Sequence, residues 1–459
     1  MRSLRTRGFK ILDEPADFEA VVCLALMRGA DFGGLGVMMP SVGRSRAKGL
    51  LLLHLPPSAA GWARFMRSSS KGTAAEPLRL RQTCRTTFGM MTENPAAALS
   101  HWLAVESPTN DPAGVNRMMD LVAQEVAALP IALERVPGRD GLGDILVLRA
   151  GPANGRQPVL LMSHLDTVHP LGTAAGDLPV RIEGDRLYGP GVYDMKGGAW
   201  LALQAFKQVC AADSAGRPLV FLFTPDEEIG SPTSRGLIEQ IGREAAAVLV
   251  TEPARLGGKI VTARKGVGRF EVKLEGRPAH AGSRHADGRS AIREAARQIL
   301  AIEAMTDYAR GITTSVALMG GGTAANVIPQ HAWFSVDCRV TSLADGVMME
   351  SRILGLTPHD RDVAIRVTGG MNRPPYEKSA PVAELFETAR RVAAGIGLDL
   401  QDCPMTGGGS DGNFTAALGV PTLDGLGIDG DGAHTLQEYA LISSIAPRQA
   451  LIKGLLETL

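Results

Sequence analysis

The segment LLMSHLDTVHP, residues 160–170, is an apolar run that ends abruptly in side chains able to bind metal ions. His164 and Asp166 close the run, and their i, i+2 spacing places both side chains on one face of an extended chain. More histidine and acidic side chains stand where later apolar runs break into glycine, proline or polar residues: Asp194, Glu227, Glu228, Glu252 and His434. Nitrogen and oxygen ligands of these types are sufficient for two zinc-type ions that share a bridge. The sequence therefore predicts a di-metal hydrolase.

The same run belongs to an alternation of strands and helices that begins near residue 144. Four apolar segments have the length and composition of strands: residues 144–151, 158–166, 218–228 and 246–253. Two segments between them have helical spacing: residues 195–209 and 234–242. Apolar strands joined by crossover helices indicate an α/β domain with a mainly parallel sheet covered by helices on both faces. In such a sheet ligands gather at the carboxyl ends of the strands, where these histidines and acids stand.

Residues 267–370 have a different pattern. Period-2 alternation over 269–282 is followed by an amphipathic helix over 290–305, two strand-like segments, a helix over 343–356 and a strand over 362–371. The order β-α-β-β-α-β is that of a ferredoxin-like unit. We therefore expect residues 267–370 to form an inserted α+β domain, and residues 91–266 and 371–459 to form the catalytic domain.

Residues 1–90 share none of these patterns. They contain arginine-rich patches, an SSSKG tract and no sustained helix or strand period. Two interpretations are open: a disordered regulatory or targeting tail, or sequence upstream of a true start at Met90 or Met91. The second is favoured, because the mixture of apolar and basic residues is not typical of such a tail. In either case we expect this leader to carry no chemistry.

Bulk composition excludes several classes of function. A chain of 459 residues with 45% hydrophobic content and zero net charge has no overall field that favours nucleic acid or an anionic membrane. Its best apolar block, residues 49–57, falls far short of the ~20 residues needed to span a bilayer. Five scattered cysteines without a CxxC pair indicate neither a disulfide framework nor a cysteine-zinc site. We therefore expect a cytoplasmic protein with no nucleic-acid or membrane partner.

The paired residues divide the chemistry of the site. Within His164 and Asp166, one side chain can bind metal while the other braces it. Adjacent Glu227 and Glu228 point in different directions if extended, so one can bind metal while its neighbour holds a water or a proton. Either pair alone is a weak signal, since such residues usually lie on the surface or cap a helix. Their joint occurrence at predicted strand and loop ends is what favours a metal site.

Eight motifs occur in an order that resembles one family: HLDTVHP, GPGVYDMKGG, TPDEEIGS, TEP, GRPAHAG, NVIP, TGGGSDGNF and GAHT. The chain from about Met91 to Leu459 is similar to the zinc-dependent glutamate carboxypeptidases, acetylornithine deacetylases, diaminopimelate desuccinylases and aminoacylases. The GGGSDGNF loop and the GDGAHTLQEY segment look most similar to the glutamate carboxypeptidase branch.

The resemblance implies a role for each candidate ligand. By similarity, Asp194 bridges two zinc ions. His164 and Glu252 complete one metal site, and Glu228 and His434 complete the other. Cobalt or manganese are possible substitutes, because ligands of these types accept several divalent ions.

The resemblance also implies three catalytic residues. Glu227 resembles the general base, and Asp166 resembles the residue that orients His164. His280, in the GRPAHAG motif, is similar to a histidine that reaches the active site of the partner subunit and helps stabilise the oxyanion. The inserted domain is therefore expected to act as a lid and to form a homodimer.

Four further residues are candidates for substrate binding. Asn326 and Arg339 resemble substrate-binding positions of the family, and Arg373 is another candidate for binding a carboxylate through its two-pronged guanidinium. Gly408 lies in a glycine loop, residues 406–414, whose backbone N–H groups are suited to a carboxylate. No GK[ST] sequence follows these glycines, so nucleotide binding is rejected.

The predicted reaction is hydrolysis of an amide bond next to a carboxylate. Its favoured form is a glutamate-carboxypeptidase-like metallopeptidase that releases a C-terminal amino acid from a small peptide. The alternative is an N-acyl amino acid deacylase of the acetylornithine deacetylase or desuccinylase type. A silent binding protein on the same fold is the non-enzymatic alternative, but it should lack a metal ligand or the base, and this chain retains both.

Overall fold

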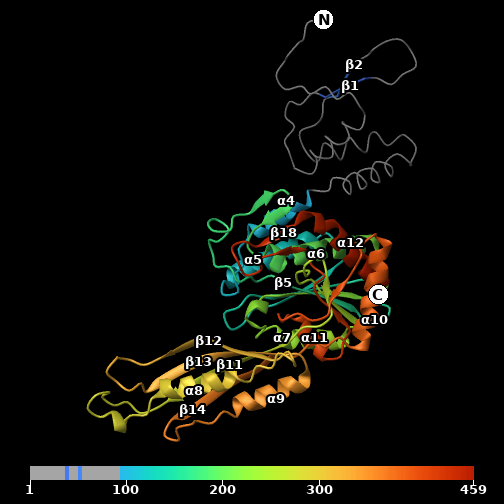
Figure 1. Cartoon of the computed structure of the whole chain (residues 1–459). Coiled ribbons are helices and arrows are strands. Elements are labelled where there is room, and N and C mark those ends of the chain that lie inside the picture. The colour runs from blue at the N-terminus through green and yellow to red at the C-terminus, as the bar shows by residue number, and fades with distance from the viewer. Residues whose placement is uncertain (1–36, 41–49, 54–93) are drawn as a thin grey trace. The chain divides into compact units, whose positions relative to one another are not determined.

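The computed structural model describes Val37–Pro40, Leu50–Leu53 and residues 94–459 (Figure 1). Strands β1 (Val37–Pro40) and β2 (Leu50–Leu53) pair antiparallel, although the sequence predicted no strand there. The rest of the leader expected at residues 1–90 lies outside the described residues. The chain divides into two compact units, Met1–Asn94 and Pro95–Leu459, and every feature discussed below belongs to the second.

A six-stranded sheet with the strand order β16-β9-β5-β8-β4-β3 forms the centre of the second unit. Its strands are β3 (Ala132–Val136), β4 (Ile145–Ala150), β5 (Val159–His164), β8 (Leu219–Thr224), β9 (Ala247–Val250) and β16 (Thr422–Leu423). The pairs β16–β9, β9–β5 and β5–β8 are parallel, whereas β4 is antiparallel to β8 and β3. Every residue of β5, β8 and β9 is buried, as strands covered on both faces require. The predicted, mainly parallel sheet is confirmed.

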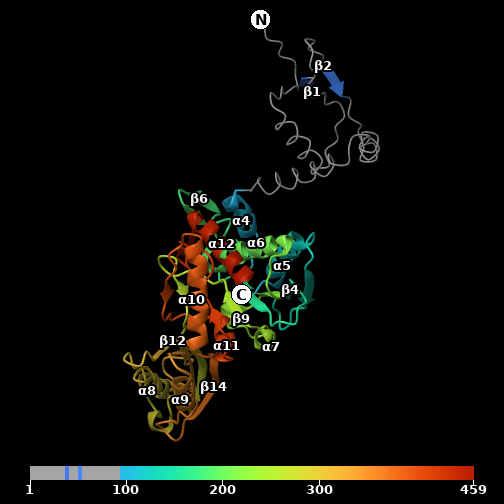
Figure 2. The same cartoon turned by 90° about the vertical axis from the view of Figure 1, so that its right-hand side faces the viewer.

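Helices cover both faces of this sheet. One face packs against a set of five helices: α4 (Pro95–Leu103), α5 (Pro112–Val126), α6 (Gly197–Ala212), α10 (Ala380–Gly395) and α12 (Ile442–Thr458). The opposite face packs against α7 (Arg235–Glu244) and α11 (Gly412–Ala417). Along β5, Leu161 belongs to the first core and Leu160 and Met162 to the second, because successive side chains point to opposite faces. In Figure 2, α10 and α12 lie side by side on the outside of the unit.

The inserted segment forms a second sheet with a core of its own (Figure 1). Its elements follow in the predicted order: β11 (Gly266–Glu275), α8 (Ala291–Glu303), β12 (Thr313–Gly321), β13 (His331–Val340), α9 (Leu343–Leu354) and β14 (Ala364–Arg373). The antiparallel strand order β12-β13-β11-β14 is ferredoxin-like. Along β11, buried and exposed residues alternate from Arg269 to Glu275, which matches the period-2 pattern read from the sequence.

Two smaller ladders were not predicted. One is a four-stranded sheet in the order β17-β18-β7-β6: β6 (Arg181–Glu183), β7 (Arg186–Tyr188), β17 (Gly430–Asp431) and β18 (Tyr439–Leu441). The other pairs β10 (Ile260–Val261) with β15 (Asp402–Cys403) in parallel. Because β18 pairs with β7, the chain that follows His434 lies beside the chain that precedes Asp194.

Short helical turns complete the path at Val192–Lys196, Glu227–Ile229 and His285–Asp287. Among the described residues, no helix has the length and apolar character needed to cross a bilayer.

Candidate active site

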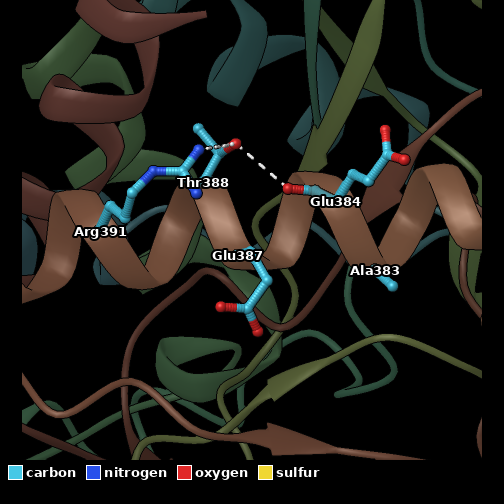
Figure 3. A pocket seen from close by; sticks show the side chains of 5 residues that line it. All are labelled: Ala383, Glu384, Glu387, Thr388 and Arg391. Carbon is cyan, nitrogen blue, oxygen red and sulfur yellow. Dashed lines mark hydrogen bonds between the residues drawn. The ribbon is translucent and has the colours of Figure 1, made fainter.

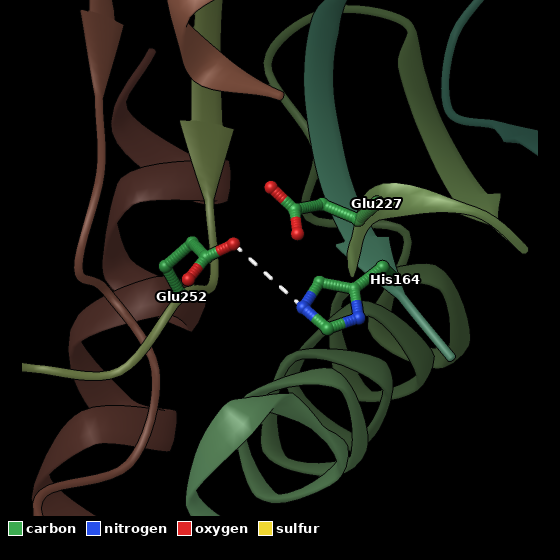
Figure 4. Close-up of side chains that lie close together, drawn as sticks. All are labelled: His164, Glu227 and Glu252. Atoms are coloured by element: carbon green, nitrogen blue, oxygen red, sulfur yellow. Dashed lines mark ion pairs between the residues drawn. The ribbon is translucent and has the colours of Figure 1, made fainter. Parts of the chain in front are cut away.

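The parallel strands β9, β5 and β8 end in polar residues at the same edge of the central sheet. His164 is the last residue of β5, the turn Glu227–Ile229 follows β8, and Glu252 follows β9. Because β5 lies between β8 and β9, these side chains meet, as Figure 4 shows for His164, Glu227 and Glu252. The His164 Nε2 atom is 3.8 Å from Glu252 Oε1.

Asp194 lies between two histidines. Its Oδ1 is 3.2 Å from His164 Nε2, and its Oδ2 is 3.3 Å from His434 Nε2. The same His434 nitrogen is 3.2 Å from Glu228 Oε2. One carboxylate that presents an oxygen to each of two histidines has the geometry that a bridging metal ligand needs.

The predicted ligands therefore come together, and Glu227 lies among them. Ligand atoms of His164, Glu227 and Glu252 lie within 4.8 Å of one another, as do those of His164, Asp194 and Glu228. Both groups include His164, and the geometry alone does not distinguish Glu227 from a ligand.

Burial and neighbouring charges shift the pKa values of the clustered carboxylates. Burial, followed by the charge of Asp194, raises the pKa of Glu228 to about 8 and that of Glu252 well above its usual range. For Asp194, burial acts in the same direction, but hydrogen bonds with His164 and His434 outweigh it and lower its pKa. The buried Oε1 atom of Glu228 has no hydrogen-bond partner. A set of imidazole and carboxylate donors with an unpaired buried oxygen fits zinc-type ions.

The histidines respond to the same negative charge. Hydrogen bonds with Asp194 and Glu228 raise the pKa of His434 to about 11. Burial opposes protonation of His164, but hydrogen bonds with Asp166 and Asp194 raise its pKa as well. A proton and a metal ion compete for the same nitrogen lone pair, so we expect metal binding to release protons here.

Asp166 holds two parts of the site at once. His164 Nδ1 is 3.0 Å from the backbone oxygen of Asp166 and 3.4 Å from its carboxylate Oδ1. The carboxylate also accepts the backbone N–H groups of Glu227 and Glu228, both at 3.2 Å, and the hydroxyl of Thr109 at 2.7 Å. This buried acid therefore contacts both the His164 ring and the turn that carries Glu227.

Glu227 is paired with Arg373. Arg373 Nη2 donates to Glu227 Oε1 at 2.7 Å, and Nη1 donates to Asp411 at 2.9 Å. Burial raises the pKa of Glu227, and the charge of Arg373 opposes the rise. Arg373 was expected to face a substrate carboxylate, but its buried guanidinium faces these two acids of its own chain.

The other predicted substrate residues fall into two places. Arg339 forms a two-pronged pair with Asp337 and donates to the Gly407 carbonyl at 3.2 Å, which brings it to the exposed glycine loop that contains Gly408. Asn326 is exposed in the inserted segment, where its backbone oxygen accepts the N–H of Ala281, next to His280.

His280 has a defined ring orientation. Its Nδ1 accepts the backbone N–H groups of Gly282 at 3.2 Å and Ser283 at 3.1 Å. In the neutral ring the proton is then on Nε2, which makes that nitrogen a hydrogen-bond donor. The side chain of His280 is exposed.

Sequence reasoning missed Glu438. Its buried carboxylate accepts the backbone N–H groups of Gly191, Tyr193 and Asp194, each at 2.9 Å, and His169 Nε2 at 2.7 Å. Both Glu438 and His169 stand inside quoted motifs, GDGAHTLQEY and HLDTVHP, and an acid four residues after His434 was the available signal. Glu438 ties the segment of His434 to the loop of Asp194.

Two hollows of the second unit differ in their chemistry. The hollow at the metal cluster is narrow and is lined by residues that include His164, Glu227, Glu252 and Asp411. The wider one lies on α10 and is lined by Ala383, Glu384, Glu387, Thr388 and Arg391 of that single helix (Figure 3). The α10 hollow contains no histidine and its two acids diverge, so the chemistry belongs to the metal cluster.

Comparison with known proteins identifies the family. Residues 160–458 match the peptidase family M20/M25/M40. The chain belongs to this family. The predicted family, its α/β fold and its activity as a metal-dependent hydrolase are thereby confirmed.

This M20 peptidase is similar in sequence or fold to several named proteins. Carboxypeptidase G2 of Pseudomonas sp. (strain RS-16) is 31% identical over 369 residues, which cover 78% of this chain and 87% of that protein. Acetylornithine deacetylase of Myxococcus xanthus is 32% identical over 239 residues, which cover 48% and 61%. The fold is similar to that of an M20 metallo-carboxypeptidase of Sulfolobus solfataricus, with a TM-score of 0.63, 18% identity and coverage of 80% and 99%.

If Asp194 bridges two metal ions, its removal should release both of them together. We expect Asp194→Ala to retain neither ion after dialysis, because this side chain faces His164 and His434 alike. His434→Ala should chiefly weaken one ion. Metal analysis of the purified variants decides the point, and two tightly held ions in Asp194→Ala would contradict the bridging role.

Glu438→Gln should loosen the metal centre without touching a metal. Each Glu438 oxygen accepts two donors, so an amide nitrogen in either position opposes two of them, and a hydrogen bond to a charged group contributes about 1.5–3 kcal/mol. We expect a lower Tm and faster loss of metal to a chelator. Glu457→Gln on α12, whose partners are Ser214 and Lys453, is the control. Wild-type metal retention in Glu438→Gln would mean that other contacts hold the Asp194 loop.

Proposed function

We propose that this M20 peptidase is a di-zinc carboxypeptidase that releases a C-terminal amino acid, glutamate in the first instance, from a small peptide. The observation that carries the proposal is the placement of Asp194 between His164 and His434, with Glu227 beside them on the turn after β8. Similarity to carboxypeptidase G2 over 87% of that protein supports a carboxypeptidase reaction.

Asp194 would bridge the ions, with His164 and Glu252 at one and Glu228 and His434 at the other. When bound, the metal ions polarise the carbonyl of the scissile amide and lower the pKa of water into the neutral range. All five ligands come from the edge of one sheet and the loops beside it, and none of them belongs to the inserted domain.

Glu227 would move the proton. Its carboxylate takes a proton from the attacking water and gives it to the nitrogen of the leaving amine. Arg373 fixes one oxygen of this carboxylate at 2.7 Å, and Asp166 fixes the backbone N–H, so the other oxygen has a defined direction.

Substrate groups would be bound at the glycine loop and by the inserted domain. Arg339 contacts Gly407, and its guanidinium and the N–H groups around Gly408 would share one carboxylate. We assign Asn326, which lies beside His280 in the inserted domain, to the binding of another part of the substrate. Arg373 can bind the substrate carboxylate only by exchanging part of its contact with Glu227 or Asp411.

A homodimer would complete the site by bringing His280 to the partner's metal centre. Strand β12, at the edge of its sheet, carries exposed Leu318 and Met319, which are 62% and 55% accessible. An exposed apolar edge strand is suited to pairing with a second copy. Cys210, Cys338 and Cys403 are unpaired, which is compatible with the cytoplasmic location that we infer.

The second candidate is deacylation of an N-acyl amino acid, favoured by the similarity to acetylornithine deacetylase. Both reactions hydrolyse an amide that bears a nearby carboxylate, so the metal cluster serves either one. They differ in what lies on the acyl side of the scissile bond.

A substrate panel separates the two candidates. With zinc added, we expect peptides that end in glutamate to have a higher kcat/KM than N-acetylornithine and N-succinyl-diaminopimelate.

Glu227→Gln should retain both metals and lose about 10²–10⁴-fold in kcat, the usual range for a general base. Glu228→Gln is the matched control, because it should lose metal as well. Near-normal turnover by metal-replete Glu227→Gln would remove Glu227 from the mechanism. A higher kcat/KM for the acylated amino acids in the panel would overturn the carboxypeptidase assignment in favour of deacylation.

Subunit mixing tests His280. We expect His280→Ala to bind two metals and dimerise normally while losing roughly 10²–10³-fold in turnover, the cost of removing one oxyanion donor. His285→Ala, five residues away and also exposed, should be unaffected. When His280→Ala and Glu227→Gln subunits exchange, each mixed dimer contains one complete site, and activity should return toward half of wild type. If exchange is confirmed and no activity returns, His280 does not act across the dimer.

A further inference from the structure

Arg264 is a fully buried cation that the functional assignments above leave unused. It lies between β10 and β11, where the chain passes from the central sheet into the inserted segment. A buried guanidinium is costly unless its donors are matched. Each of its partners belongs to a different part of the site.

The strongest partner is Asp424, which follows β16. Arg264 Nε donates to Asp424 Oδ2 at 2.7 Å and Nη2 donates to Oδ1 at 2.8 Å, a two-pronged pair with both residues completely buried. Ser410 Oγ donates to Asp424 Oδ2 as well. The pair is therefore fixed at the end of the edge strand β16, in contact with Ser410 of the glycine loop.

The third nitrogen of Arg264 contacts that loop. Nη1 donates to the carbonyls of Gly408 at 3.1 Å and Gly409 at 3.4 Å. Because these two carbonyls point toward the buried guanidinium, the neighbouring backbone N–H groups of the loop point away from it. The guanidinium thus fixes the backbone orientation of the loop that we assign to the substrate carboxylate.

The same guanidinium faces a metal ligand. Arg264 Nη2 is 3.9 Å from Glu252 Oε2, the oxygen opposite the one that lies 3.8 Å from His164. A cation on the far side of a carboxylate favours one orientation of that carboxylate and leaves the near oxygen for the metal.

The backbone of Arg264 ties the two chain crossings together. Its N–H donates to the Tyr376 carbonyl at 2.9 Å, and the Tyr376 N–H donates back at 3.0 Å, so the segment entering the inserted domain pairs with the segment leaving it. On the other side, the Thr406 N–H donates to Ala263 and the Lys265 N–H donates to Thr406.

We propose that Arg264 is a positioning residue that holds the ligand Glu252 and the glycine loop at Gly408 in a fixed relation. Metal and substrate carboxylate are then bound at a constant separation. This role rests on the proposed assignment of Glu252 as a metal ligand and of the loop as a carboxylate site. Arg264 touches neither the substrate nor the metal ions.

Lysine cannot replace this arginine. Its ammonium keeps the charge, but it is a single point that cannot meet both oxygens of Asp424, two loop carbonyls and Glu252 together. Arg264→Lys therefore removes the geometry while the net charge of the site stays constant. Asp424→Asn is a second, nearly isosteric variant. It releases the guanidinium from its anchor and leaves an uncompensated positive charge near the metals, and both effects weaken cation binding.

The test is zinc titration of the apoprotein against a chromophoric chelator, without substrate. Glu252→Gln and His434→Ala first assign the two binding steps to their sites. In Arg264→Lys and Asp424→Asn we expect the Glu252 step to weaken by about 10–100-fold, the usual effect of changing a residue behind a metal ligand. The Glu228–His434 step should change little. On the peptide substrate, KM should rise by a larger factor than kcat falls, because the loop is displaced in the ground state.

Arg448→Lys is the matched control. Arg448 is also buried and donates to the carbonyls of Gly425, Gly427 and Gly258, but it forms no ion pair with a carboxylate of the described residues. It should lower the Tm and leave both zinc steps unchanged. Equal weakening of the Glu252 step in Arg448→Lys, or wild-type zinc affinity in both Arg264→Lys and Asp424→Asn, would overturn the proposal. Failure of the proposed function is a separate result: the wild-type apoprotein would then bind no zinc, or the metal-loaded enzyme would cleave no peptide.

Discussion

Parallel strand alignment forces acids together at one edge of the central sheet. Strands β9, β5 and β8 end side by side, so the residues that follow them share a small buried volume. Burial and mutual repulsion raise the pKa of Glu228 and Glu252 there. The topology therefore favours the binding of cations at this edge of the sheet.

A second set of buried acids binds no metal in our assignment but places the residues that do. Asp166 holds the turn of Glu227 and Glu228 through their backbone N–H groups, and Glu438 holds the loop of Asp194 in the same way. Asp424 anchors Arg264 behind Glu252. In each case a buried carboxylate accepts N–H donors, from the short turns that carry Glu227 and Asp194 or from the side chain of Arg264, and so fixes a segment that lies outside the strands of the central sheet.

Much of this arrangement could be read from the sequence, because it follows local periodicity. The apolar runs before His164, Glu227 and Glu252 predicted strands whose ends carry ligands, and the alternation over β11 predicted the inserted sheet. The pairing of β7 with β18 could not be read, since three-residue strands have no detectable period and their partners are about 250 residues apart. The salt bridge of Glu227 with Arg373 could not be read for a similar reason: Glu227 was expected to act as the base and Arg373 to bind a substrate carboxylate, and only the fold shows that the two side chains are paired.

The inserted domain is joined to the catalytic machinery more closely than a flexible tether would require. Arg373, at the end of β14, holds Glu227, and its neighbour Asn372 donates to the Gly230 carbonyl at 3.0 Å. From β11, Arg269 donates to the Ile229 carbonyl at 3.1 Å. Adjacent strands of the inserted sheet therefore contact successive residues of the turn that carries the proposed base. A substrate group bound by this domain therefore has a fixed position relative to Glu227. Transfer of a proton from Glu227 to the leaving nitrogen requires such a fixed position.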